Sequence, residues 1–336
     1  MKVIILRNSL TCLDENNILI GNAFLELGHE VSFGLINSVY SQNYNVSVEG
    51  IEYKEELEID SNLVGDLRNM CLIDFDLVWV MNQPHPSLEK DVYQLLWLAS
   101  QKVNFVNSIE GIYFLNNKNN LGFVDEIKEY LIESYTSNNF NFISRLVNLT
   151  DGKWILKPTN SGCGSDVFVI DRNESNTRAL LQSATGNSEM GAVISGNSIL
   201  GITEKYTVLQ KYIKEVKKGE KRVILCAGKV TAVHGREIQD GENRSNISQG
   251  GKLTSAELSK EETEMCELIG EVLLEKGIRF VGIDISFPYL LEFNIVNPGG
   301  LYDCYLSSGE NNSKIGISNI LSFFDLLWGY KWSINI

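Results

Sequence analysis

The alternation of short apolar segments with amphipathic segments over the first 112 residues is the feature that most restricts how this chain can fold. The apolar segments are rich in β-branched residues and too short for helices, which is typical of buried strands. The amphipathic segments repeat their apolar residues at the helical period, and Gly28 is placed to end the first of them. The expected strands are 2–6, 29–33, 77–81 and 103–106, and the expected helices are 15–28 and 88–102. This order predicts an α/β unit with a mostly parallel sheet.

The rest of the chain predicts a mixed α+β organisation in two further units. In the middle, strands are expected at 154–156 and 167–170, and residues 182–203 form an irregular segment rich in Gly, Ser and Asn. Further on, the pattern predicts a hairpin around Gly228, a capping box at 259–262 that opens a helix ending at Gly277, strands at 280–286 and 289–296, and a helix at 317–328. We expect domains at 1–114, 115–204 and 205–336.

Charge and composition exclude several classes of protein. Asp and Glu outnumber Lys and Arg by 43 to 29, a net charge of −14, so nucleic acid is not the expected partner. No apolar run approaches the ~20 residues that span a bilayer, and the N-terminal apolar stretch is too short for a signal peptide. The six cysteines are widely spaced and the three histidines dispersed, which favours reduced thiols and gives a zinc site little support. We expect a cytoplasmic protein without a membrane or nucleic-acid partner.

Two carboxylates on neighbouring strands are the strongest local evidence for a site. In 280–286 the odd positions are apolar and Asp284 lies on the other face, and in 290–295 the same pattern leaves Glu292 and Asn294 opposite the apolar side chains. If Pro288 lies at the hairpin centre, Asp284 and Glu292 are cross-strand neighbours, which destabilises a sheet unless a positive group lies between them. Two carboxylates and an amide oxygen suit Mg²⁺ that bridges to phosphates. The alternative, polar residues on a solvated sheet face, stays open at this point.

Basic residues and glycines elsewhere could bind an anion. Lys157 ends a strand and is followed by a loop in which Gly162 and Gly164 would allow backbone amides close to a phosphate. The loop lacks the Walker A pattern and could equally be a plain turn. Arg222, Arg236 and Arg244 are suited to phosphate or carboxylate contacts, although any one of them could be a solvated surface charge.

The order of these motifs resembles the ATP-grasp superfamily, and within it bacterial glutathione synthetase. The motifs in chain order are Lys118, Lys157-Pro158 with its Gly loop, 210–212, 220–222, Arg236, Arg244-x-Asn246, 281–284 and Glu292-x-Asn294. The resemblance implies an ATP-grasp fold with an N-terminal Rossmann-like pre-ATP-grasp domain. It also implies ATP as cosubstrate and Mg²⁺ as the metal, with two ions expected and Mn²⁺ as an alternative.

The same resemblance implies a role for each matching residue. Lys118 and Lys157 would contact the α- and β-phosphates, and a flap from Ser161 through Gly162 and Gly164 to Ser165 would cover them. Adenine and ribose would be bound by Gln210, Lys211, Tyr212, Ile213 and Glu220. The γ-phosphate and the acyl phosphate would be held by Arg222, Arg236, Arg244 and Asn246, and the metal by Asp284, Glu292 and Asn294.

The resemblance implies an ATP-dependent carboxylate–amine ligase that forms an amide through an acyl phosphate. The chain departs from glutathione synthetases at Arg244-Ser-Asn246, where they carry Arg-Gly-Asn, and at 81–86, where their basic residues are missing. Alternatives are therefore a ligase acting on a peptide or a specialised metabolite, and a nucleotide-binding regulatory protein without turnover. The expected substrates are a small-molecule or short-peptide acid and amine, and the oligomeric state, including a homo-oligomer, stays open.

Overall fold

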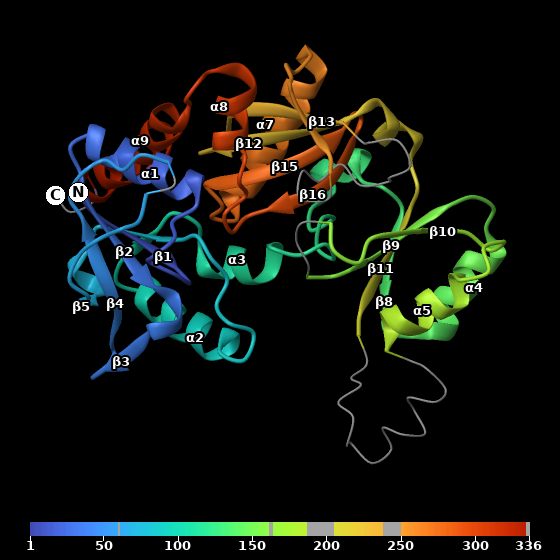
Figure 1. Cartoon of the computed structure of the whole chain (residues 1–336), viewed down its shortest axis with the longest axis horizontal. Coiled ribbons are helices and arrows are strands. Elements are labelled where there is room, and N and C mark those ends of the chain that lie inside the picture. The colour runs from blue at the N-terminus through green and yellow to red at the C-terminus, as the bar shows by residue number, and fades with distance from the viewer. Residues whose placement is uncertain (60, 161–163, 187–204, 238–249, 334–336) are drawn as a thin grey trace.

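The computed structural model describes residues 1–336 except 60, 161–163, 187–204, 238–249 and 334–336. Its strands form three sheets, and the last of them in chain order lies between the other two along the long axis of the molecule (Figure 1). The first sheet has seven strands in the order β3-β4-β2-β1-β6-β7, with β5 paired to β4. Its strands are β1 (Lys2–Arg7), β2 (Glu30–Leu35), β3 (Tyr40–Gln42), β4 (Asn45–Tyr53), β5 (Arg68–Cys71), β6 (Leu77–Val80) and β7 (Asn104–Phe105).

The four parallel strands of the first sheet are the ones that the sequence predicts. Strands β2, β1, β6 and β7 are parallel, whereas β3, β4 and β5 add an antiparallel extension that the sequence analysis did not predict. Alternate residues of β1 face opposite sides, so that Ile4 packs toward α2 (Glu89–Ser100) and α3 (Ile109–Leu115), and Val3 toward α1 (Glu15–Glu26). Helices therefore cover both faces, as in a doubly wound sheet.

The second sheet has four strands in the order β10-β9-β11-β8 and is covered by two helices. The elements are β8 (Ser134–Ser137), α4 (Phe140–Leu149), β9 (Trp154–Pro158), β10 (Phe168–Ile170), α5 (Thr177–Thr185) and β11 (Thr207–Lys211). Strand β11 pairs with both β9 and β8, so this sheet includes residues beyond position 205. The domain boundaries expected from the sequence stay predictions.

The third sheet has five antiparallel strands in the order β14-β13-β12-β15-β16. Its elements are β12 (Glu220–Cys226), β13 (Lys229–Glu237), β14 (Lys252–Ser255), α7 (Lys260–Glu275), β15 (Phe280–Ser286), β16 (Tyr289–Asn294), α8 (Leu301–Ser308) and α9 (Ser313–Ser333). The expected hairpin turns at Ala227 and Gly228, which both have positive φ. The capping box between Ser259 and Glu262 is also present.

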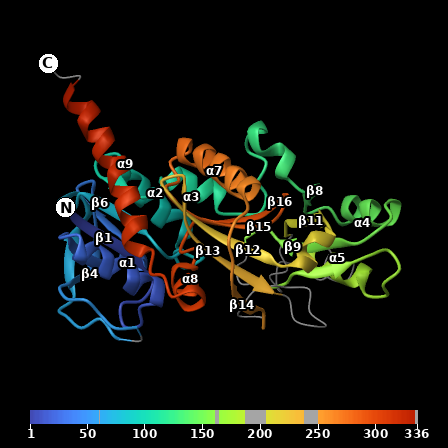
Figure 2. The same cartoon turned by 90° about the horizontal axis from the view of Figure 1, so that it is seen from above.

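The first and third sheets share their hydrophobic cores. One core combines residues of α2 and α3 with residues of α7 and the odd positions of β15, and the other combines α1 with α8 and α9. Figure 2 shows α9 running beside α1, away from the second sheet. The remaining short 3₁₀ helices are Ile36–Ser38, Leu72–Asp74, Asp125–Tyr130 and Lys214–Lys218.

Two further expectations can be compared with the described residues. None of the helices in the described ranges is both long and apolar enough to cross a membrane. Cys12, Cys71, Cys226, Cys266 and Cys304 are free thiols, while Cys163 lies outside the described residues.

Candidate active site

The hairpin of β15 and β16 brings the two predicted carboxylates together. Asp284 is the cross-strand partner of Glu292, and Asn294 pairs with Gly282 on the same face. The hairpin turns at Phe287 and Pro288, and a shift of register between Asp284 and Ile285 restores the pairing that a symmetric hairpin around Pro288 predicts. The prediction that the carboxylates are neighbours is confirmed.

Asp284 does not lie on a solvated part of the sheet face. It is only 5% exposed, and every residue of β15 is buried, whereas Glu292 and Asn294 on β16 are half-buried. The alternative interpretation as a solvent-exposed strand position was therefore wrong for Asp284. Alternation along a strand reports two different faces, but it does not show what covers the second one.

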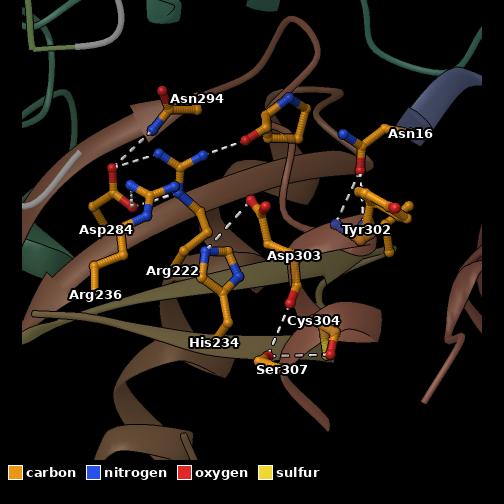
Figure 3. A network of polar contacts seen from close by, with 12 residues as sticks. Asn16, Arg222, His234, Arg236, Asp284, Asn294, Tyr302, Asp303, Cys304 and Ser307 are labelled. Carbon is orange, nitrogen blue, oxygen red and sulfur yellow. Dashed lines mark hydrogen bonds and ion pairs between the residues drawn. The ribbon is translucent and has the colours of Figure 1, made fainter. Parts of the chain in front are cut away.

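Two arginines from neighbouring strands supply the positive charge that the paired carboxylates require. Arg222 is the cross-strand partner of Asp284 and binds both of its oxygens, Nε to Oδ1 and Nη2 to Oδ2 at 2.7 Å. Arg236, from β13, places Nη1 3.6 Å from Oδ1 of Asp284 and 3.4 Å from Oε1 of Glu220. Figure 3 shows Arg222, Arg236 and Asn294 around the Asp284 carboxylate. Asn294 Nδ2 donates to Oδ2 of Asp284 at 3.2 Å.

Two buried lysines approach the same face from other parts of the chain. Lys118 lies after α3, and its Nζ is 3.3 Å from Oε1 of Glu292. Lys157, at the end of β9, donates from Nζ to the side-chain oxygen of Gln210 at 3.0 Å. The backbone amide of Lys118 also donates to the carbonyl oxygen of Thr159, which joins it to the start of the Gly loop. The lysines are 8% and 7% exposed, so neither is a solvated surface charge.

Burial and neighbouring charges shift the pKa values of this cluster. Burial lowers the pKa of Lys157 to about 8, partly opposed by Glu292. Burial also opposes the charged forms of Arg222 and Asp284. The salt bridge between them outweighs it, which raises the pKa of Arg222 and lowers that of Asp284. The pair is therefore ionised at neutral pH, while the lowered pKa brings Lys157 close to physiological pH.

The oxygen ligands around Asp284 fit a Mg²⁺ ion that also binds phosphates. Asp284, Glu292 and Asn294 offer carboxylate and amide oxygens, which are hard ligands of the kind that Mg²⁺ prefers. In the described part of the chain, no three His, Cys, Asp or Glu side chains are grouped closely enough to hold a metal alone. Arg222 and Lys118 moreover balance the carboxylates. Asp284, Glu292 and Asn294 would therefore hold a Mg²⁺ ion only together with further ligands, which the phosphates of a nucleotide could supply.

Other residues expected from the sequence lie near this cluster with less direct evidence. Gln210 and Lys211 are in β11, and the amides of Lys211 and Tyr212 donate to the carbonyl oxygens of Glu133 and Lys153. Glu220 contacts Arg236. Their contacts with adenine and ribose stay predictions, as does that of Ile213. Gly164 has a φ of +68°, a backbone conformation that favours glycine. Four expected residues lie outside the described residues: Ser161, Gly162, Arg244 and Asn246.

Two residues next to Arg222, Pro298 and His234, were not predicted from the sequence. The carbonyl oxygen of Pro298 accepts a hydrogen bond from Nη1 of Arg222. His234, the cross-strand partner of Arg222, is fully buried, with Nε2 3.7 Å from Oδ2 of Asp303. Burial, followed by the charges of Arg236 and Arg222, lowers the pKa of His234 to about 3, so the ring is neutral. Its place two residues before Arg236 on a strand was the available signal, because i and i+2 share a face.

Comparison with known proteins begins with the fold. The macrocyclase MdnC from Microcystis aeruginosa, solved with its precursor peptide MdnA, superposes with a TM-score of 0.62 at 14% identity, covering 96% of this chain and all of that one. The ATP-grasp ligase PsnB, solved with a minimal precursor, gives 0.59 at 12% identity over 96% of this chain and 97% of its own. The fold is that of an ATP-grasp protein.

Sequence comparison then gives the family. Residues 121–307 match the family model described as prokaryotic glutathione synthetase, ATP-grasp domain. The chain belongs to this family, and it is an ATP-dependent carboxylate–amine ligase that forms an amide bond. The glutathione synthetase of Gloeobacter violaceus is 24% identical over 252 residues, 71% of this chain and 70% of the relative. That of Agrobacterium fabrum is 31% identical over 193 residues, 57% of this chain and 56% of the relative.

Proposed function

We propose that this ligase makes its acyl phosphate on the buried face of the third sheet, between Arg222, Arg236, Lys118 and Lys157. The observation that carries the proposal is the convergence of these four cations, drawn from distant segments of an acidic chain, on one pair of carboxylates. Such a concentration of buried positive charge suits a polyphosphate, whose charge exceeds that of the two carboxylates.

The proposed reaction has two steps and requires little side-chain acid–base chemistry. An oxygen of the substrate carboxylate attacks the γ-phosphorus. The bond between the γ-phosphorus and the oxygen that bridges the β- and γ-phosphates breaks, and ADP leaves with that electron pair. The amine then attacks the acyl carbon, the carbon–oxygen bond to phosphate breaks, and the amide forms with release of phosphate and a proton. Arg222 and Arg236 would orient the transferred phosphoryl group and neutralise its charge, with Arg244 and Asn246 in the same role.

Lys118 and Lys157 would hold the α- and β-phosphates, and Gln210 would fix Lys157 through their side-chain hydrogen bond. Asp284, Glu292 and Asn294 would hold Mg²⁺, with two ions proposed and Mn²⁺ as a substitute. When bound, the metal supplies Lewis-acid charge neutralisation at the phosphates. The Gly loop from Ser161 to Ser165 would cover the phosphates and exclude water. The adenine and ribose contacts of residues 210–213 and Glu220 belong to the same proposal, and the compartment that we propose is the cytoplasm.

For the substrates we propose an acid and an amine of the glutathione synthetase type. The curated relatives are named glutathione synthetases. A second candidate, ligation of a peptide or a specialised metabolite, is favoured by the segment after β6. There, Asn82 accepts a hydrogen bond from Arg7 Nε at 3.1 Å. The His85 ring is hydrogen-bonded to the Ser87 hydroxyl, and its backbone amide donates to Asn37 Oδ1. Residues 81–86 also contain no Lys or Arg that could bind the carboxylate of a second substrate.

Hydroxylamine offers a test that does not require the natural amine. It attacks acyl phosphates and gives a hydroxamate, so that each turnover with the correct acid should yield equal amounts of ADP and hydroxamate. A panel of γ-glutamylcysteine, other dipeptides and single amino acids would be screened with Mg·ATP. A response to γ-glutamylcysteine alone supports the glutathione synthetase type, and a response to other acids supports the second candidate. ADP without hydroxamate contradicts the acyl phosphate, and no ADP with any acid favours a regulatory protein.

A further inference from the structure

The segment that follows β16, residues 297–302, lies between the arginine cluster (Arg222 and Arg236) and the first sheet. It contains Asn297, Gly299 and Gly300 in the left-handed region, with φ values of 46°, 66° and 86°. Three of its first four residues thus have positive φ, a conformation that residues other than glycine and asparagine rarely adopt. The backbone of the segment is therefore strongly constrained. It ends at the start of α8, whose N-cap is Gly300.

One side of this segment packs directly on Arg222. The carbonyl oxygen of Pro298 accepts from Nη1 of the guanidinium. A Cβ atom on Gly300 would lie 3.3 Å from Cγ of Arg222, and one on Gly282, beneath the arginine, would lie 2.6 Å from Cβ of Pro298. The arginine stem is thus enclosed between β15 and the segment, which leaves Arg222 5% exposed. The position of the segment determines where the Arg222 guanidinium can lie.

The other side of the segment is bound by the first turn of helix α1, which packs on the first sheet. Asp14, the N-cap of α1, accepts from Nδ2 of Asn297 at 2.9 Å through Oδ2, which also lies 3.1 Å from Nη2 of Arg7. Oδ1 of Asp14 accepts from the amide of Asn17 at 3.0 Å, which is the cap itself. Asn16 Oδ1 accepts from the amides of Leu301 and Tyr302 at 3.0 and 3.1 Å (Figure 3).

We propose that Asp14 is a positioning residue for phosphoryl transfer: through Asn297 it fixes the 297–302 segment, and the segment fixes the guanidinium of Arg222. The inference rests on the proposed function, because it takes Arg222 as a γ-phosphate contact. Two hydrogen bonds in series, from Asn297 to Asp14 and from Arg222 to Pro298, join helix α1 to the Arg222 guanidinium. Helix α1 would thereby act on the chemistry through the position of Arg222.

The test compares nucleotides that differ only in the γ-phosphate. Calorimetry measures the dissociation constants of Mg·ADP and of Mg·AMPPNP, and their ratio is the preference for the γ-phosphoryl group. Asp14→Asn keeps one oxygen for the cap, at which Asn is as effective as Asp, but turns an amide toward the Asn297 amide and Arg7. Loss of one well-placed hydrogen bond to a charged phosphate is worth about a factor of ten. We expect Asp14→Asn to lower the ratio about five- to tenfold and Asn297→Asp to do the same.

The double variant Asp14→Asn with Asn297→Asp exchanges donor and acceptor across the contact and should restore the ratio to within about twofold. Ser108→Ala is the matched control, because it removes a helix cap and a hydrogen bond to the Lys276 carbonyl, another contact with the C-terminal part, without touching the segment. It should leave the ratio unchanged. A general structural role of Asp14 would weaken both nucleotides equally, which would overturn the proposal, and so would a double variant no better than the single ones.

Arg222→Lys separates this inference from the function on which it rests. The lysine keeps a positive charge beside Asp284 but loses the planar fork and the contact with Pro298. If Arg222→Lys lowers the ratio and Asp14→Asn does not, the coupling is wrong and the phosphate site stands. If Arg222→Lys leaves the ratio unchanged, the γ-phosphate role of Arg222 is wrong, and the coupling through Asp14 is overturned with it.

Discussion

Replacing Asp284 by alanine should destabilise the protein far more than a substitution on an exposed strand. The change leaves Arg222, a residue that is only 5% exposed, without the carboxylate that binds two of its nitrogen atoms. Breaking a buried ion pair from one side costs about 3–5 kcal/mol, because the remaining charge stays buried without compensation. An exposed strand position would cost only ~0.5 kcal/mol. The two interpretations of this sheet face therefore differ by a factor of about six to ten.

Urea unfolding followed by circular dichroism measures the effect. With a denaturant slope of about 3 kcal/mol/M, the midpoint of Asp284→Ala should fall by about 1–1.7 M. Removing both charges, in the double variant Asp284→Leu with Arg222→Met, should recover most of this loss, because an apolar pair of similar size avoids the desolvation of two ions. Both variants should lack ligase activity at any Mg²⁺ concentration.

The pH dependence gives a second measurement of the same pair. Because Arg222 lowers the pKa of Asp284 in the folded protein, the carboxylate stabilises the fold above its unfolded pKa of about 4 and loses this effect as the pH falls through the folded value. The midpoints of wild type and Asp284→Ala should therefore converge below pH 4. A midpoint within about 0.3 M of wild type at pH 7, or a double variant as unstable as the single one, would refute the reasoning.

Three further predictions concern the ligands of the nucleotide. Glu292→Gln should raise the Mg²⁺ concentration needed for half-maximal ADP release at least tenfold. The free energy of unfolding should change by no more than ~1 kcal/mol, because the Glu292 side of its salt bridge with Lys118 is partly exposed. An unchanged Mg²⁺ requirement would contradict the metal assignment. Since burial lowers the pKa of Lys157 to about 8, ATP binding at pH 9 should take up a proton in wild type and not in Lys157→Met, as measured by calorimetry in two buffers of different ionisation enthalpy. Equal proton uptake in both proteins would exclude Lys157 as the titrating group. Gly164→Val, which places a β-branched residue at a φ of +68°, should raise the ratio of ADP to amide or lower both products; unchanged yields would mean that this loop is only a turn.

The sequence predicts the elements of the site better than their surroundings. Strict alternation in 280–286 and 290–295 was enough to place Asp284 beside Glu292, because the side-chain period of a strand is fixed. The burial of that face could not be predicted, because it depends on Arg222, the 297–302 segment and other residues that are distant in sequence. The hydrogen bond from Lys157 to Gln210 likewise requires β9 to pair with β11, about 50 residues further on.

The antiparallel extension of the first sheet was missed for two different reasons. In strand β4 the apolar residues Val46 and Val48 alternate with the polar residues Ser47 and Glu49, and this alternation in the sequence was a usable signal. Strand β5, Arg68–Cys71, has no buried residue, and short polar edge strands cannot be distinguished from loops by periodicity. The parallel strands were predicted because they are buried on both faces and read as continuous apolar runs.

In the described residues, the two chain connections of the four-stranded sheet lie side by side. The chain enters it at Ser134 and leaves it at Lys211. Ser134 pairs with Gln210, and the Lys211 amide donates to Glu133. Among the described residues, the fully buried members of its core lie between Ile143 and Leu209, and the two cores shared by the other sheets contain no buried residue from 134–211. Two adjacent connections and a separate core make this part of the molecule an exchangeable module. Evolution could replace it while Arg222 and Arg236 stay in place on the third sheet.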